Sequence, residues 1–85
     1  MKKNIVILGS TGSIGLNTLS IIRKDKKSFN IKLLSTNQNI KKIIQQAKEF
    51  NVKNVIINNR KKYLIAKKKY KKLNINFHNS FSIID

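Results

Sequence analysis

Three glycines that follow a short apolar run constrain this chain more than any other feature of its sequence. Residues 5–8 (IVIL) are all strongly apolar, which is typical of a strand buried on both faces of a parallel sheet. Gly9, Gly12 and Gly15 follow at regular spacing, and helical periodicity begins at Gly15. A strand, a glycine turn and a helix in this order predict the start of a βαβ unit.

Each glycine has a physical reason in a loop that binds a dinucleotide. Gly9 lets the chain leave the strand in a tight turn, and Gly12 lets the backbone approach a pyrophosphate. Gly15 lets the helix pack closely on the strand. The free amides near Ser13 and Ile14 would then face the anion, with the positive end of the helix dipole behind them.

The same loop excludes two other kinds of site. No Gly-Lys-Ser/Thr follows the turn, so it is not a P-loop, and no G-x-S-x-G is present, so it is not a nucleophile elbow. Thr11 and Ser13 add hydroxyl donors to the loop. The alternative is that the glycines form a tight turn in an α/β protein that binds nothing there. Because the loop lies between a strand and a helix, we interpret it as a diphosphate site.

The remaining residues alternate between strand and helix patterns. Strands are expected at 31–35, 55–57 and 74–78. Helices are expected from 15 to an end between 24 and 27, at 40–50 and at 61–72. Asn39 is placed to cap the second helix, and Asn58 or Asn59 to cap the third. Residues 80–85 would begin another element. The order βαβαβαβ predicts an α/β fold, a Rossmann-like, doubly wound parallel sheet that is truncated, in one domain of residues 1–85.

The residues after the second strand indicate which dinucleotide fits. NAD sites generally place Asp or Glu about 20 residues beyond the glycines, on the ribose 2′-hydroxyl. Residues 35–39 read STNQN and contain no acid. Neutral amides and hydroxyls can donate to a 2′-phosphate, and Lys41 and Lys42 add positive charge nearby, so NADP(H) is favoured over NAD.

The net charge of +16 has two possible explanations. A strongly basic chain can bind nucleic acid or an acidic membrane, and the lysine-rich residues 61–72 would then form the binding surface. However, roughly half of the residues are Lys, Asn or Ile, which AT-rich codons encode, and proline is absent. We favour codon bias over a polyanion site, and we expect neither nucleic acid nor membrane as a partner.

The composition also limits the compartment and the chemistry. No apolar run is long enough to span a membrane or to form a signal peptide, so we expect a cytoplasmic protein, or one of a plastid-like organelle. The absence of cysteine excludes disulfides and thiolate metal sites. His78 is the single histidine, and the acids Asp25, Glu49 and Asp85 lie far apart in sequence. We therefore assign no catalytic residue and no metal ligand.

The residues 7–15 (ILGSTGSIG), with the NTL that follows at 17–19, resemble the start of the 1-deoxy-D-xylulose 5-phosphate reductoisomerase family. Residues 37–39 resemble that family's second cofactor loop, and residues 46–50 (QAKEF) resemble its second helix. The family often carries a glycine and a basic residue where this chain has Asn37 and Gln38. By position, the resemblance implies NADPH contacts from Thr11, Gly12, Ser13, Ile14, Asn37, Gln38 and Asn39, and the glycine spacing adds Gly9 and Gly15 to the predicted cofactor site.

The resemblance also implies an NADP-dependent oxidoreductase of the non-mevalonate isoprenoid pathway. Members of the family convert 1-deoxy-D-xylulose 5-phosphate to 2-C-methyl-D-erythritol 4-phosphate with NADPH and a divalent metal (Mg²⁺, Mn²⁺ or Co²⁺), as homodimers. Their metal ligands and substrate residues follow the cofactor domain, so we expect this chain to bind NADPH and to be inactive alone. The residues themselves leave open a fragment of another NAD(P)-dependent oxidoreductase, or a basic nucleic-acid-binding module.

Overall fold

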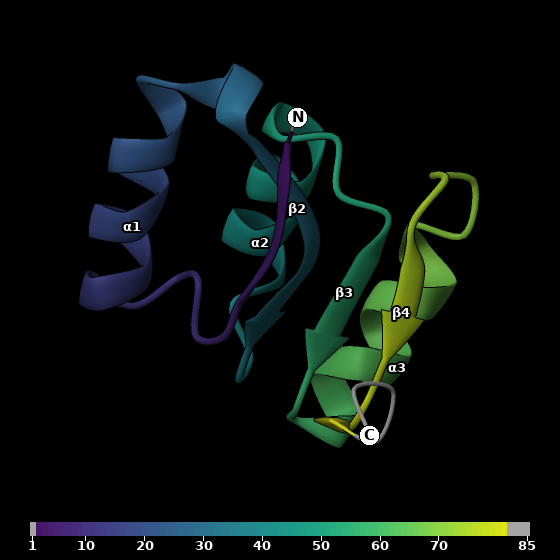
Figure 1. Cartoon of the computed structure of the whole chain (residues 1–85). Helices are drawn as coiled ribbons and strands as arrows, with labels where there is room; N and C mark the ends of the chain where they lie inside the picture. Colours follow the sequence, from purple (N-terminus) through teal and green to yellow (C-terminus); the bar gives the residue numbers. More distant parts are fainter. Residues whose placement is uncertain (1, 82–85) are drawn as a thin grey trace.

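The computed structural model describes residues 2–81 and shows four strands that alternate with three α-helices (Figure 1). The strands are β1 (Lys3–Ile7), β2 (Phe29–Thr36), β3 (Asn54–Ile57) and β4 (Asn76–His78). The helices are α1 (Ser13–Arg23), α2 (Ile40–Glu49) and α3 (Arg60–Lys69), and a short 3-10 helix, η1 (Lys26–Ser28), precedes β2. The predicted βαβαβαβ order is confirmed, while the element expected at 80–85 lies almost wholly outside the described residues.

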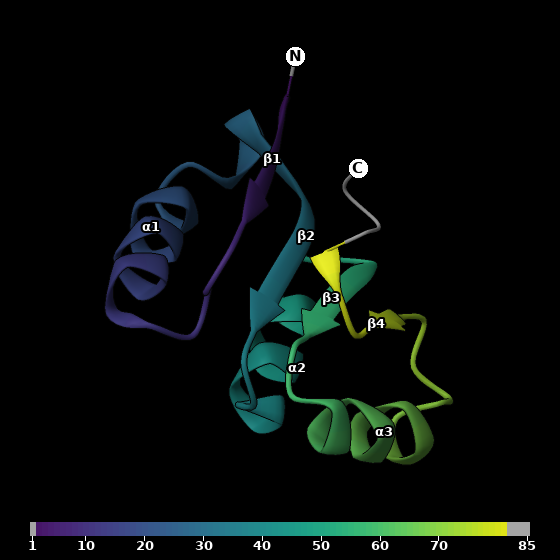
Figure 2. The same cartoon turned by 90° about the horizontal axis from the view of Figure 1, so that it is seen from below.

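All neighbouring strands are parallel, and they lie in the order β1-β2-β3-β4. Because βαβ crossovers are right-handed, this consecutive order places α1, α2 and α3 along one face of the sheet (Figure 2). A doubly wound sheet carries a second set of helices on the other face. The described part of the chain therefore contains one of the two windings of a Rossmann-like sheet.

The core lies between the sheet and these helices. Ile7, Leu34 and Val55 from the three longer strands belong to one buried cluster with Leu19 of α1 and Ile43 of α2. Each such side chain contributes roughly 1.5–3 kcal/mol by leaving water. This burial fixes the position of α1 relative to the ends of the strands. It therefore also positions the loop that joins β1 to α1.

An extra residue in β2 explains why its burial does not alternate regularly. The register between β1 and β2 shifts between Ile5 and Val6, and Lys32 has no partner in β1. Such a bulge reverses the alternation beyond it. Leu34 consequently pairs with Ile7 on the core side of the sheet, where a regular strand would have turned it to the opposite face.

Asparagine side chains cap two of the helices. The Oδ1 atom of Asn39 accepts the Lys42 N–H at 3.2 Å, and that of Asn59 accepts the Lys62 N–H at 3.0 Å. The predicted cap at Asn39 is confirmed, and of the two candidates for α3 the structure selects Asn59. Within residues 2–81, no helix combines the length and apolar character needed to cross a membrane.

The predicted end of the third helix is wrong. α3 ends at Lys69, whereas the periodicity predicted a helix to Lys72. A longer helix would place Lys71 and Lys72 four residues after Lys67 and Lys68, and like charges at that spacing destabilise a helix. The chain turns instead and returns to the sheet as β4.

Candidate dinucleotide-binding site

The loop of residues 8–12 joins β1 to α1 at the carboxyl edge of the sheet, beside the turn that follows β2 (Figure 1). In open α/β sheets ligands bind at this edge. The hydroxyl oxygens of Thr11 and Thr36 lie 2.7 Å apart. The two predicted cofactor loops are therefore neighbours in space, as the parallel order of the strands required.

Two of the three glycines are required by the fold itself. Gly9 has a φ of 67°, a left-handed conformation that other residues adopt only with strain. A Cβ atom at Gly15 would lie 2.4 Å from the Gly9 carbonyl oxygen and 2.5 Å from the Ser10 Cα atom. Gly15 thus packs α1 against the glycine turn, rather than against the strand as predicted.

Gly12 differs from the other two because the fold does not require a glycine there. Its φ of −86° and ψ of 177° are open to any residue, and an added Cβ atom would make an ordinary contact at 3.5 Å with the Gly9 carbonyl oxygen. In the predicted site, the absence of a side chain at Gly12 leaves the start of α1 accessible to a ligand. The reason for glycine at this position is therefore the space that a ligand needs, and not the packing of the loop.

The start of α1 can accept an anion. Gly12 is the N-cap, so α1 begins at Ser13, earlier than predicted, and no side chain caps it. The amides of Ser13 and Ile14 have no partner inside the helix, and both residues are exposed, Ile14 to 83%. Open amides, an exposed surface and the positive end of the helix dipole fit a diphosphate.

A buried polar cluster, Ser10, Ser35 and Gln46, supports the loop from inside. The three residues are 0%, 2% and 5% exposed. Gly9 N–H donates to Ser35 Oγ at 2.8 Å, and Ser10 N–H donates to the Ser35 carbonyl at 2.8 Å. The Ser10 hydroxyl donates to Gln46 Oε1 at 2.7 Å, and Gln46 Nε2 donates to the Ser10 carbonyl at 2.9 Å. These bonds connect the glycine loop to β2 and α2.

This cluster was not predicted from the sequence. One signal was available, because Gln46 lies three residues after Ile43 and next to Ala47, within the apolar stripe of α2. A polar residue in such a stripe is normally hydrogen-bonded in the interior. Its partner could not be found in the same way, since Ser10 is 36 residues away along the chain.

The Thr11 hydroxyl, predicted as a donor to the cofactor, is engaged with Thr36. Thr36 Oγ1 also accepts the Asn39 N–H at 3.3 Å. If the Thr36 proton is directed to Thr11, the Thr11 proton remains available to a ligand. Thr11 therefore links the two loops, and its contact with a cofactor stays a prediction.

The second predicted loop is open to solvent. Asn37, Gln38 and Asn39 are all exposed, as is Lys41 in the first turn of α2. Because Asn39 uses Oδ1 for the helix cap, its Nδ2 group remains a donor. No acid lies among residues 35–39 to repel a 2′-phosphate, so the surface agrees with the predicted choice of NADP(H).

The two acids among the described residues, Asp25 and Glu49, lie away from this edge. Glu49 ends α2 and receives two hydrogen bonds from Arg23 of α1, one of them 2.9 Å long. The hydrogen bond from Arg23 holds the pKa of Glu49 below its ordinary value. Within residues 2–81, no three His, Cys, Asp or Glu side chains come together as a metal site. The residues present do not fit the family's divalent metal, so we assign it no role in this chain.

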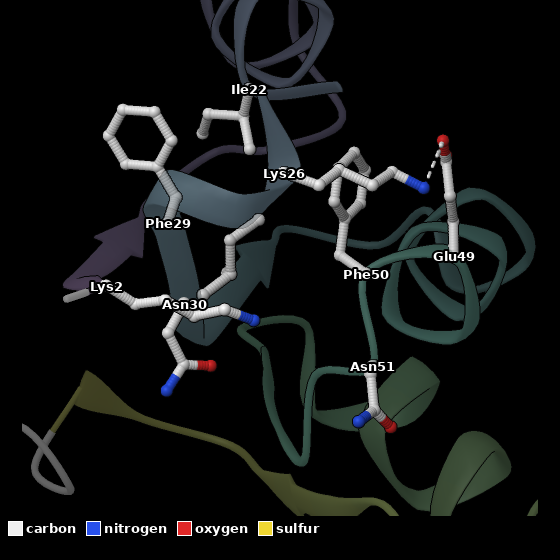
Figure 3. A pocket seen from close by; sticks show the side chains of 9 residues that line it. Lys2, Ile22, Lys26, Phe29, Asn30, Glu49, Phe50 and Asn51 are labelled. Atoms are coloured by element: carbon white, nitrogen blue, oxygen red, sulfur yellow. Dashed lines mark ion pairs between the residues drawn. The ribbon is translucent and has the colours of Figure 1, made fainter. Parts of the chain in front are cut away.

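A cavity of about 230 Å³ lies at the opposite edge of the sheet, near the amino ends of β1 and β2. Figure 3 shows Phe29, Phe50 and Lys26 around it, with Lys26 Nζ 4.0 Å from Glu49 Oε2. Lys26 Nζ also lies 5.2 Å from the centre of the Phe50 ring. The cavity lies far from the glycine loop, so it is not the diphosphate site.

His78 lies in β4, separated from β1 by two strands. Its Nε2 atom is 3.2 Å from Asn54 Oδ1, and burial lowers the pKa of its imidazole. This contact links β3 to β4. His78 therefore does not lie near the glycine loop, and we assign it no catalytic role.

A parallel βαβ sheet with an open helix start after its first strand is the arrangement of Rossmann-like dinucleotide-binding proteins, and the chain has this class of fold. Residues 5–82 match the family described as 1-deoxy-D-xylulose 5-phosphate reductoisomerase. The chain belongs to this family. The match covers the described residues except the first few. It therefore decides between this family and the two alternatives, a fragment of another NAD(P)-dependent oxidoreductase and a basic nucleic-acid-binding module.

Individual relatives agree. The 1-deoxy-D-xylulose 5-phosphate reductoisomerase of Pelagibacter ubique (strain HTCC1062) is 47% identical over 83 residues, which cover 98% of this chain and 21% of the relative. That of Porphyromonas gingivalis (strain ATCC 33277) is 51% identical over 63 residues, which cover 74% of this chain and 16% of the relative. The chain thus spans about a fifth of the length of these curated relatives.

Solved structures show the same fold. The Zymomonas mobilis reductoisomerase in complex with NADPH superposes with a TM-score of 0.84 at 27% identity, covering 92% of this chain and 21% of that one. A DOX-P reductoisomerase in complex with NADPH, fosmidomycin and magnesium gives a TM-score of 0.85 at 26% identity, covering 96% and 20%.

Proposed function

We propose that this chain forms the NADPH-binding part of a 1-deoxy-D-xylulose 5-phosphate reductoisomerase. The observation that carries the proposal is the open start of α1, where Gly12 leaves space and the helix amides lack partners. The same fold occurs in two relatives whose structures contain NADPH. Family membership and the geometry of the loop support the same cofactor.

The residues of this chain would hold two parts of the cofactor. The amides of Ser13 and Ile14, with the helix dipole, would bind the diphosphate. Asn37, Gln38 and Asn39 would donate to the 2′-phosphate of the adenosine ribose. Bound NADPH supplies a hydride for reduction.

We extend the proposal to the whole enzyme. It would convert 1-deoxy-D-xylulose 5-phosphate to 2-C-methyl-D-erythritol 4-phosphate as a homodimer, in the cytoplasm or a plastid-like organelle. Its divalent metal would be held by residues outside this chain. The described residues would contribute cofactor binding and no step of bond rearrangement.

Fluorescence titration with NADPH and NADH tests the proposal. We expect NADPH to bind more tightly than NADH, because no carboxylate faces the 2′-phosphate. Gly12→Ala should raise the Kd for NADPH about tenfold or more, since its methyl group would narrow the approach of the diphosphate. Ser20→Ala, at an exposed position of α1, is the matched control and should bind as the unaltered chain does. A folded sample that binds neither nucleotide, or prefers NADH, would contradict the proposal.

A further inference from the structure

Gln46 contacts Ser10 through both ends of its side-chain amide. Its Nε2 group donates to the Ser10 carbonyl at 2.9 Å, and its Oε1 atom accepts the Ser10 hydroxyl at 2.7 Å. Both residues are buried. A paired contact of this kind fixes the orientation of the main chain at Ser10 as well as the position of its side chain.

In the described part of the chain, the Ser10 carbonyl accepts its hydrogen bond from Gln46. The N–H and hydroxyl of Ser10 also bond to the Ser35 carbonyl, at 2.8 and 3.3 Å. Among residues 2–81, no other donor reaches the Ser10 carbonyl oxygen. Ser35 therefore anchors one side of Ser10, while Gln46 determines the orientation of the peptide group that follows.

That peptide group carries the N–H of Thr11. None of the described peptide bonds is cis, and in a trans peptide the carbonyl and the N–H point in opposite directions. Since the Ser10 carbonyl points inward to Gln46 of α2, the Thr11 N–H points away from α2, to the open side of the loop. No acceptor for this N–H lies in the described part of the chain.

We propose that Gln46 is a positioning residue for the cofactor loop: by holding the Ser10 carbonyl inward, it directs the Thr11 amide outward as a phosphate donor beside the start of α1. The inference rests on the proposed function, because it assigns the loop to a phosphate ligand. Gln46 itself is 5% exposed and lies beneath the loop, so it acts through Ser10 and Thr11.

Gln46→Leu tests this inference, with Gln45→Leu as the matched control. Both residues lie in α2, but Gln45 is exposed and Gln46 is buried. We expect Gln46→Leu to raise the Kd for NADPH about tenfold or more while the circular dichroism spectrum stays that of a folded α/β protein. Gln45→Leu should bind NADPH as the unaltered chain does.

The NMR signal of the Thr11 amide gives a second readout that needs no cofactor. Gln46→Leu should shift or broaden this signal in the free protein, whereas Gln45→Leu should not. If the unaltered chain fails to bind NADPH, the proposed function falls, and the Thr11 signal still tests the role of Gln46. An unchanged Thr11 signal and an unchanged Kd in folded Gln46→Leu would overturn the inference.

Gln46→Glu is the second variant if Gln46→Leu does not fold. It keeps the size of the side chain and the contact with the Ser10 hydroxyl, but the carboxylate cannot donate to the Ser10 carbonyl. The same loss of NADPH affinity and the same change at Thr11 are expected. If neither variant folds, Gln46 is a structural residue and the positioning role is refuted.

Discussion

A methyl group at position 15 would meet backbone atoms that cannot move aside. The Gly9 carbonyl oxygen and the Ser10 Cα atom lie 2.4 and 2.5 Å from its place. We therefore expect Gly15→Ala to lower the free energy of unfolding by about 3 kcal/mol, because α1 must shift away from the turn. Urea unfolding followed by circular dichroism measures this change.

Gly12→Ala is the control for that substitution. Its Cβ atom would make an ordinary 3.5 Å contact, so the cost should be about 1 kcal/mol or less, mainly from a poorer N-cap residue. Gly12→Ala should thus weaken NADPH binding with little loss of stability, while Gly15→Ala should weaken the fold. Equal losses of stability in the two variants would contradict this division of roles.

His78 should make the stability depend on pH. Burial lowers its pKa from the ordinary 6.5, so the unfolded chain binds a proton more readily than the folded one. The unfolding free energy contributed by neutral His78 is complete above 6.5 and decreases as pH falls below that value. We expect chemical denaturation to show this decrease as pH falls below 6.5.

His78→Gln should remove most of that pH dependence, because glutamine does not titrate. Glu49 is the other described group whose lowered pKa links stability to pH, and the contribution from its bond to Arg23 is lost only as pH falls below 4.5. Between pH 6.5 and pH 4.5 the change in stability therefore comes from His78 and not from Glu49. A variant that kept the full decrease between pH 6.5 and pH 4.5 would show that another group causes it.

At the scale of single elements, the cap of α2 is the contact whose loss is easiest to isolate. Asn39→Ala removes the bond between Asn39 Oδ1 and the Lys42 N–H and should lower the unfolding free energy by about 1 kcal/mol. Thermal unfolding measures the difference. Asn37→Ala, in the same turn and equally exposed, is the control and should cost less, since its side chain makes no hydrogen bond within residues 2–81. Equal costs would show that Asn39 does not act as a cap.

At the scale of the whole molecule, the charge should oppose folding. The net charge is +16, and Asp25 and Glu49 are the acids in the described part of the chain. The Cα radius of gyration is 12.2 Å, whereas the screening length at 0.01 M salt is about 30 Å, so the cations repel one another across the entire fold.

Added salt should therefore stabilise the protein. We expect the Tm to rise by about 4–8 °C, equivalent to about 1 kcal/mol, between 0.01 and 0.3 M NaCl, as measured by calorimetry. KCl should act equally, because screening depends on ionic strength. A Tm that stayed constant or fell would show that the exposed lysines are too far apart to matter. The Arg23–Glu49 pair opposes the trend only weakly, as surface ion pairs contribute little.

Features that depend on local spacing could be predicted from the amino-acid sequence. The apolar run before Gly9, the stripes of α1 and α2 and the asparagine before α2 each act within a few residues, so the order of elements, the cap at Asn39 and the place of the glycine loop were all predictable. The absence of an acid at residues 35–39, after β2, is also visible in the sequence itself. Family membership rests on the same local motifs, which the comparisons then confirmed.

Contacts between segments that are distant along the chain could be found only in the folded protein. Ser10 finds Gln46 through the packing of α2 on the sheet, and the bulge at Lys32 depends on how β2 pairs with β1. Gly12 and Gly15 cannot be told apart from the sequence. In the fold, a Cβ atom would have space at Gly12 and would clash with backbone atoms at Gly15. Spacing along a chain encodes local geometry, whereas the surroundings of a side chain depend on residues that only folding brings near.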